Sequence, residues 1–329
     1  MKTPVRLIAF LVAGVMSYSG AAQRTAPASL LILNKNDATL VIVDPASGNI
    51  QATIPVGEGP HELTTSTDGK LAFASNYGGQ TGGRTISVID LAARKELRRV
   101  DVSPLSRPHG LAFYGGKLYF TAENDQVIGR YDPATDKIEA QFKTGQATTH
   151  MVLISPDGRH MFTSNIRGNT VSIFDRGAAA GEWVNPTAVA VGRGPEGLDL
   201  SPDGKELWSA HSQDGGVSVI DVATRAVVAT IDLKTRRSNR LKFTPDGARV
   251  LVTDLDAGQL VVVDAKARKE ITRVALGRMV EGILIAPDGS KAYVAENGDD
   301  TVAVVDLKTL TVLTRIKPGG GPDGMAWGR

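Results

Sequence analysis

The chain has 329 residues, of which 42% are hydrophobic, so it is long enough to bury a large core in one or two domains. Its formal net charge is +2, and without Lys2 and Arg6 it holds 35 basic and 35 acidic residues. This balance gives no overall attraction to nucleic acid or to an anionic membrane. The absence of cysteine excludes disulfides, thiolate metal ligands and cysteine nucleophiles.

Residues 1–22 have the layout of a secretory signal peptide. Lys2 and Arg6 precede the apolar run LIAFLVAGVM at 7–16, and small residues follow up to Ala22. That run is about half as long as a bilayer requires, and no later stretch is long enough to span a membrane. We therefore expect a protein that is periplasmic or secreted after cleavage near Ala22, with a mature chain at 23–329.

One sequence repeat occurs seven times from residue 30 onwards. Its hexamers are versions of TVSIFD, and their closing aspartates, spaced 42 to 46 residues apart, are Asp44, Asp90, Asp132, Asp175, Asp221, Asp264 and Asp306. These aspartates are expected to cap turns. Most units also contain a turn such as SPDG at 155–158, and each reads as four short strands. This pattern predicts an all-β seven-bladed propeller with four antiparallel strands per blade.

The two ends of the repeat predict how the ring closes. The first unit begins with LLILN at 30–34, and the chain ends in a lone strand that contains GMAW at 324–327. We expect the C-terminal strand to become the innermost strand of the N-terminal blade, which removes open sheet edges. The predicted organisation is a single propeller domain over 23–329.

Several stretches resemble the exported YVTN-repeat seven-bladed propellers. They are ATIPVGEGP at 52–60, KAYVAEN at 291–297 and TVAVVDLKTLTV at 301–312, together with the SPDG turns. The resemblance covers residues 28–329 and implies the fold but no particular activity, because one fold hosts many functions. The architecture is more distantly similar to lactonase-type propellers and to the haem-d1-type propeller of dissimilatory nitrite reductases. No catalytic motif of either can be matched here.

Polar residues recur at two equivalent positions of the units. The first position directly precedes the innermost strand and holds His61, His109, His150, Glu196, Asn239, Glu281 and Asp323. The second position ends the next strand and holds Asn34, Asn76, Glu123, Asn165, His211, Asp254 and Glu296. Because these strands are antiparallel neighbours, we expect both positions to lie at one mouth of the central channel, where ligand sites commonly occur.

Three interpretations of these positions stay open. The first is a solvated channel mouth without a ligand. The second is a site for a divalent transition metal, because imidazoles and carboxylates suit Zn, Cu, Fe or Ni; the predicted ligands are His61, His109, His150, Glu123 and Glu196. The third is metal-free acid–base chemistry by histidine beside carboxylates. His211 and Glu281 are predicted to bind a ligand at the same mouth.

The segment KTRRSNRLK at 234–242 holds five basic residues in nine and replaces the usual hinge of the fifth unit. It is either a solvated loop or a clamp for a carboxylate or phosphate, since arginine binds these groups in a bidentate manner. In the second case Arg236, Arg237 and Arg240 bind the anion. So short a patch in a balanced chain is no strong signal for nucleic acid.

The sequence thus predicts an exported, monomeric propeller that binds a small ligand, a metal or a protein partner at a channel mouth lined by histidines and carboxylates. The alternative is a metal-assisted hydrolase or lyase acting on a lactone-like or anionic substrate. The sequence contains no ordered Ser-His-Asp arrangement, no phosphate-binding glycine loop and no dinucleotide fingerprint. Whether the protein is an enzyme stays open on sequence alone.

Overall fold

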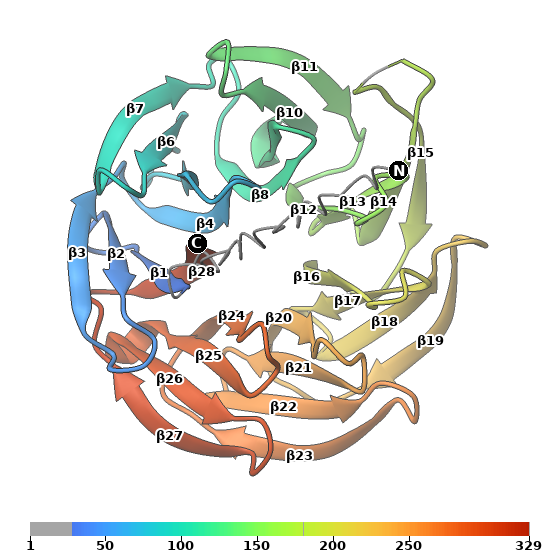
Figure 1. The fold of residues 1–329 in the computed structure, drawn as a ribbon. Coiled ribbons are helices and arrows are strands. Elements are labelled where there is room, and N and C mark those ends of the chain that lie inside the picture. Colours follow the sequence, from blue (N-terminus) through green and yellow to red (C-terminus); the bar gives the residue numbers. More distant parts are fainter. Residues whose placement is uncertain (1–27, 180, 329) are drawn as a thin grey trace, which may run out of the picture.

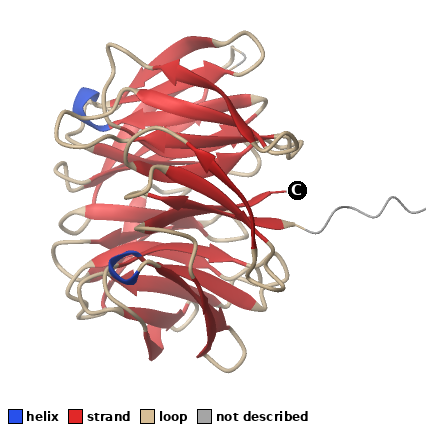
Figure 2. Cartoon of the chain, turned by 90° about the vertical axis from the view of Figure 1, so that its left-hand side faces the viewer, coloured by secondary structure: helices blue, strands red, loops and turns tan. Residues whose placement is uncertain are grey.

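The computed structural model describes residues 28–179 and 181–328, and these form a seven-bladed β-propeller (Figure 1). Seven four-stranded antiparallel sheets surround a central channel within these ranges, which confirms the predicted fold class. In side view the loops gather on the two faces of the disc (Figure 2). The predicted signal peptide at 1–22 lies outside the described residues.

Each blade runs from the channel to the rim. The innermost strands are β4 (Pro60–Thr65), β8 (Pro108–Tyr114), β12 (Thr149–Ile154), β16 (Pro195–Leu200), β20 (Ser238–Phe243), β24 (Val280–Ile285) and β28 (Pro322–Gly328). The second strands are β1 (Ser29–Asn34), β5 (Leu71–Asn76), β9 (Lys117–Ala122), β13 (His160–Asn165), β17 (Glu206–His211), β21 (Arg249–Asp254) and β25 (Lys291–Glu296).

The outer half of each blade completes the sheet. The third strands are β2 (Thr39–Val43), β6 (Thr85–Asp90), β10 (Val127–Asp132), β14 (Thr170–Arg176), β18 (Gly216–Asp221), β22 (Gln259–Asp264) and β26 (Thr301–Asp306). The outermost strands are β3 (Ile50–Pro55), β7 (Lys95–Asp101), β11 (Lys137–Lys143), β15 (Trp183–Ala190), β19 (Ala226–Asp232), β23 (Lys269–Ala275) and β27 (Thr311–Ile316). Two short 3-10 helices, η1 (Glu123–Asp125) and η2 (Asn297–Asp299), follow β9 and β25.

The ring closes as the sequence predicts. β28 pairs with β1 in antiparallel register, with Leu30 opposite Trp327 and Ile32 opposite Met325. The C-terminal strand is therefore the innermost strand of the N-terminal blade, and the two lie side by side in Figure 1. This pairing gives β1 the neighbour that the N-terminal half of the chain cannot supply.

The hydrophobic core lies between the blades. In the described residues, seven clusters of buried apolar side chains each join two consecutive blades. Between the blades of β17 and β20, for example, Trp208 packs edge-on against Phe243 with ring centroids 5.4 Å apart. Because both faces of each sheet are covered, the second and third strands are buried along most of their length.

The repeated aspartates serve the turns, as expected for residues at strand ends. Six of the seven accept a hydrogen bond from a backbone N–H two or three residues further on; Asp44, for instance, accepts from Ala46 at 2.9 Å. The exception is Asp175, which pairs with Arg225 at 2.6 Å. Tight turns of this kind hold the strands of each blade in register and leave the channel mouth to other residues.

Candidate functional site

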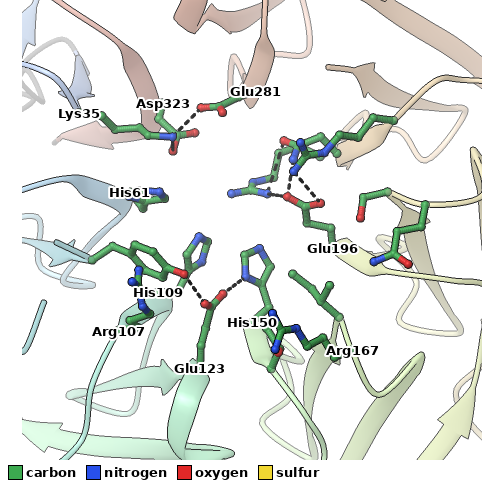
Figure 3. Close-up of a pocket in the computed structure, with 18 of the residues that line it drawn as sticks. Lys35, His61, Arg107, His109, Glu123, His150, Arg167, Glu196, Glu281 and Asp323 are labelled. Atoms are coloured by element: carbon green, nitrogen blue, oxygen red, sulfur yellow. Dashed lines mark hydrogen bonds and ion pairs between the residues drawn. The ribbon is translucent and has the colours of Figure 1, made fainter. Parts of the chain in front are cut away.

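A cavity of about 830 Å³ occupies one mouth of the channel. Its lining contains all seven residues of the first predicted position, His61, His109, His150, Glu196, Asn239, Glu281 and Asp323. Each stands in an innermost strand next to its first residue, so every blade contributes one side chain to the same space. Figure 3 labels His61, His109, His150, Glu196, Glu281 and Asp323 around the cavity.

The second predicted position does not line the cavity, except at Glu123. Several of these side chains instead accept hydrogen bonds from backbone N–H groups in the hinge of their own blade. Gly57 donates to Asn76 at 3.1 Å, and Gly277 donates to Glu296 at 2.8 Å. Asp254 binds the N–H groups of Arg236 and Arg237 in the same way, each at 3.0 Å.

The cavity is lined instead by residues that directly follow the second position: Lys35, Tyr77, Asn124, Ile166 and Ser212. Successive side chains of an extended chain point to opposite sides, so a step of one residue exchanges one set for the other. The expectation that both positions face the channel therefore fails for six of the seven second-position residues.

His211 is one of the residues turned away from the cavity. Its side chain is fully buried, and its Nδ1 lies 3.0 Å from Oδ1 of Asp214. Burial lowers its pKa. The two residues after it, Ser212 and Gln213, line the cavity in its place.

Three histidines stand together on one side of the cavity. The ring centroids of His61 and His109 are 5.3 Å apart, and those of His109 and His150 are 3.8 Å apart. They come from β4, β8 and β12, which belong to three successive blades. Burial lowers the pKa of His61 to about 4 and that of His109 well below its usual value. Both imidazoles are therefore neutral at neutral pH.

Hydrogen bonds fix the tautomers of two of these histidines. Nδ1 of His61 lies 2.8 Å from the carbonyl oxygen of Gly59, which can only accept, so Nδ1 carries the proton and Nε2 keeps its lone pair. Nδ1 of His150 donates to Oε1 of Glu123. Among the described residues, Nε2 of His150 and Nδ1 of His109 are buried and have no hydrogen-bond partner.

Glu123 links His150 to Tyr77. Its Oε2 accepts a 2.6 Å hydrogen bond from the Tyr77 hydroxyl, and its Oε1 accepts from His150. Burial is the largest single influence and would raise the pKa of Glu123, but the interactions with His150, Tyr77 and His61 together outweigh it, so the pKa is lowered. Ligand atoms of His109, Glu123 and His150 lie within 4.8 Å of one another, so this group could hold a metal ion.

A charged cluster faces the histidines. Nζ of Lys35 lies 3.0 Å from Oε2 of Glu281 and 3.4 Å from Oδ2 of Asp323. Burial, and then the neighbouring Asp323 charge, raise the pKa of Glu281 to about 7. Burial opposes ionisation of Asp323 too, but Lys35 and Arg240 hold its pKa below the usual value.

The three arginines predicted as an anion clamp are separated in the structure. Arg236 is exposed and does not line the cavity. Arg237 lines the cavity with a half-exposed side chain, 3.9 Å from Oε2 of Glu196. Arg240 is largely buried, and its guanidinium lies 2.7 Å from Oε1 of Glu62 and 3.6 Å from Oε1 of Glu196. Arg240 is thus committed to carboxylates of the chain itself.

Glu196, a predicted metal ligand, is also engaged. Its Oε1 accepts a 2.5 Å hydrogen bond from the Asn239 amide in addition to the contact with Arg240.

Three residues at the mouth of the channel were not predicted from the sequence: Lys35, Glu62 and Tyr77. Lys35 and Tyr77 directly follow Asn34 and Asn76, and this position in the repeat is the only sequence signal for them. The hydrophobic pattern of the strands does not show which of the two neighbouring positions faces the channel.

Below the mouth cavity the lining of the channel turns apolar. Gly282 and Gly324 let neighbouring innermost strands approach closely, since a Cβ on Gly324 would lie 2.3 Å from the His61 carbonyl oxygen. Beyond the Glu62–Arg240 pair lies a second cavity of about 390 Å³, lined mainly by apolar residues such as Phe113 and Trp327. The polar chemistry is therefore confined to one mouth of the channel.

No protein-family model matches the sequence, and neither does any functionally curated sequence. Among solved structures, the chain is similar to a functionally unknown protein from Desulfotomaculum acetoxidans DSM 771. The TM-score is 0.78 and the identity 11%, over 91% of this chain and 98% of that chain.

Two further solved structures are similar over most of this chain. One is a putative 6-phosphogluconolactonase from Bacteroides uniformis ATCC 8492, with a TM-score of 0.76 and 16% identity over 91% of this chain and 99% of that chain. The other is the dihydro-heme d1 dehydrogenase NirN in complex with DHE, with a TM-score of 0.66 and 18% identity over 89% of this chain and 64% of that chain. At these identities the similarity shows the fold alone.

The described residues also include no helix that is long and apolar enough to cross a membrane.

Proposed function

We propose that this chain is an exported, monomeric propeller of the YVTN-repeat type that binds a divalent transition metal through His61, His109 and His150 and offers it to a small ligand in the mouth cavity. One observation carries the proposal: the rings of three histidines adjoin on one side of the cavity, and Nδ1 of His109 and Nε2 of His150 are buried without a partner among the described residues. A buried polar atom without a partner costs about 1–3 kcal/mol, which a bound metal would recover.

The second contacts of the histidines support the proposal. Metal-binding histidines commonly donate their other ring nitrogen to a carbonyl or a carboxylate, which fixes the tautomer and the ring orientation. His61 has such a partner in Gly59 and His150 has one in Glu123. Neutral imidazoles are required for binding, and the lowered pKa values of His61 and His109 supply them.

In this arrangement Glu123 and Glu196 act beside the metal. Glu123 already accepts hydrogen bonds from His150 and Tyr77, and Glu196 accepts one from Asn239. Three histidine ligands with a position open to the cavity are the pattern of catalytic zinc sites, whereas structural sites use four protein ligands. A metal held this way would polarise a carbonyl and lower the pKa of a bound water.

A metal-assisted hydrolase or lyase is the second candidate function, with a lactone-like or anionic substrate. Glu281 favours it, because a carboxyl group with a pKa of about 7 can both give and take a proton at neutral pH. Glu281 and Asp323 face the histidines from the other side of the cavity, as Figure 3 shows. A substrate between them would contact the acid–base group and the metal from opposite sides.

Metal analysis of the purified protein tests the proposal. The mature chain is purified without chelator, its metal content is measured, and the stripped protein is titrated with Zn²⁺ and with Co²⁺. We expect one tight ion per chain, lost in His61→Ala, His109→Ala and His150→Ala. His160→Ala is the matched control, because this histidine lies on β13 beside Asp175 and does not line the cavity. Absence of tight binding, or an equal loss in the control, would exclude the site.

Export is tested separately at the N-terminus. The first 22 residues suggest cleavage near Ala22, so N-terminal sequencing of protein from the cell envelope should begin at Gln23. Recovery of the intact chain from the cytoplasm would argue against export.

A further inference from the structure

The mouth cavity holds more positive than negative side chains. Five cations, Lys35, Arg107, Arg167, Arg237 and Arg240, and four carboxylates, Glu123, Glu196, Glu281 and Asp323, contribute to its lining. Three of the cations lie within 4 Å of carboxylates: Lys35, Arg237 and Arg240. The remaining two, Arg107 and Arg167, have no carboxylate partner among the described residues.

Arg107 is fixed beside the histidines by neutral groups. Its guanidinium lies over the Tyr77 ring, 4.7 Å from the centroid, and donates to the carbonyl oxygens of Gly79 and Gln80 at 3.3 Å. Its own carbonyl accepts a 3.2 Å hydrogen bond from the Glu123 N–H. The side chain is therefore held at the mouth, two residues before His109, with its charge uncompensated.

Arg167 lies in the next blade, in the turn that follows β13. The N–H groups of Ile166 and Gly168, on either side of it, donate to Thr148 and Ala147 at 2.9 and 3.1 Å. These bonds fix the turn against the hinge that leads to His150. The exposed Arg167 side chain has no hydrogen bond or ion pair with any described residue. In Figure 3, Arg107 and Arg167 flank Glu123 on the side of the cavity that carries His109 and His150.

We infer that the ligand of this cavity carries a carboxylate or phosphate group that bridges the metal and the guanidinium groups of Arg107 and Arg167. The inference rests on the proposed metal site. A divalent ion would add two positive charges beside two arginines that have no carboxylate partner among the described residues, so an anion is the ligand that neutralises them. Guanidinium groups bind the planar oxygen pairs of carboxylates and phosphates in a bidentate manner.

The position of this clamp differs from the one that the basic segment 234–242 suggests. Arg240 and Arg237 lie on the other side of the cavity, close to Glu62 and Glu196, so an anion there would meet carboxylates already in place. Arg107 and Arg167 offer their charge without such competition. They also come from the two blades that supply His109 and His150.

Titration of the cobalt-loaded protein tests this inference. Co²⁺ is bound first and free metal is removed, and binding of the ion is read from its visible absorption before any anion is present. Inorganic phosphate and acetate are then added separately, and the change in the Co²⁺ absorption gives the affinity of each. We expect at least one of the two to perturb the band, and the tighter one identifies the group that the site prefers.

Variants at the arginines separate this inference from the metal site. Arg167→Gln should weaken anion binding about 10- to 150-fold and leave Co²⁺ binding unchanged, since a lost charge-assisted hydrogen bond is worth about 1.5–3 kcal/mol. Arg167→Lys keeps the positive charge but loses the bidentate guanidinium, so its affinity for the anion should lie between those of the wild type and Arg167→Gln. The control is Arg193→Gln, because Arg193 is an exposed arginine of another hinge that does not line the cavity.

The outcomes are distinct. If Co²⁺ binds but neither anion perturbs it, or if Arg167→Gln and the control bind the anion equally, the anion bridge is wrong and the metal site stands. If Co²⁺ does not bind, the metal site fails, and the bridge fails with it.

Discussion

Arg240 donates a 2.7 Å hydrogen bond to Glu62 across the central channel. The two residues lie on β20 and β4, whose blades are three steps apart in the ring of seven, the largest separation that the ring allows. Both side chains are largely buried. The ion pair therefore joins opposite sides of the propeller and divides the polar mouth cavity from the apolar cavity beyond it.

Breaking this pair should destabilise the whole ring. Arg240→Met leaves the carboxylate of Glu62 buried without its partner, and the loss of one member of a buried ion pair typically costs about 3–5 kcal/mol. Chemical denaturation of the variant measures this cost.

The double variant Glu62→Met/Arg240→Met is the control for the pair itself. Replacing both charges by apolar groups of similar length removes the unpaired carboxylate of Glu62, so it should recover a large part of the stability. If the double variant is no more stable than Arg240→Met, the cost does not come from the unpaired Glu62 carboxylate.

Ring closure gives a second prediction. Removing residues 322–329 deletes β28, exposes the edge of β1 and uncovers apolar neighbours such as Ile32 and Tyr293. The loss should exceed several kcal/mol, which is most of the stability of a typical domain. Thermal unfolding by circular dichroism should show a transition lowered by more than 10 °C or no cooperative transition at all, as ~1 kcal/mol shifts a large domain by ~2–4 °C. An unchanged transition would contradict the closing role of β28.

The fold could be predicted because its cause is local and repeated. Each unit carries its own turn residues and its own apolar strands. Seven copies of this pattern therefore give seven blades, whichever side chains line the channel mouth. The first polar position was predictable for the same reason. It comes at a fixed place relative to each innermost strand, and the ring brings those places together.

The rest of the site depends on contacts that the sequence pattern does not contain. A side chain at the second position either faces the channel or binds the backbone of the hinge, and a shift of one residue along the chain exchanges the two. Among the residues of the second position, only Glu123 faces the cavity. The role of Arg240 depends on Glu62, 178 residues away in the sequence. The free charge of Arg167 could not be predicted either, because it follows from the absence of a nearby carboxylate among the described residues.

Glu281 should make the stability of the metal-free protein depend on pH. Its pKa is about 7 in the folded chain and near 4.5 when exposed, so between these values the folded state holds a proton that the unfolded state releases. The stability that this proton contributes is fully present below pH 4.5 and is lost as the pH rises through 7.

The Glu281→Gln variant isolates this effect because glutamine stays neutral. Compared with the variant, the wild type should lose about 2–3 kcal/mol between pH 4.5 and pH 8, at about 1.4 kcal/mol per pKa unit. Urea denaturation of both proteins at several pH values measures the difference. A difference that stays constant from pH 4.5 to pH 8 would show that Glu281 titrates normally in the folded chain.

The last prediction concerns the role of Glu123 at the metal site. The carboxylate lies close enough to His109 and His150 to be a ligand, yet both of its oxygens already accept hydrogen bonds, from His150 and from Tyr77. We therefore expect it to orient the His150 ring. Loss of such an orienting carboxylate typically weakens metal binding about 10–100-fold, whereas loss of a ligand removes most of the affinity.

Four variants distinguish the two roles by titration with Zn²⁺. Glu123→Gln keeps an acceptor for the His150 N–H but loses the charge, so its affinity should fall about tenfold, and Glu123→Ala should fall toward the 100-fold end of the range. Tyr77→Phe removes only one hydrogen bond to Glu123 and should have a smaller effect than either. His150→Ala should lose far more than all three. If Glu123→Ala is as damaging as His150→Ala, Glu123 is itself a ligand, because loss of an orienting residue leaves the His150 ring in place and should weaken binding less than loss of that ring.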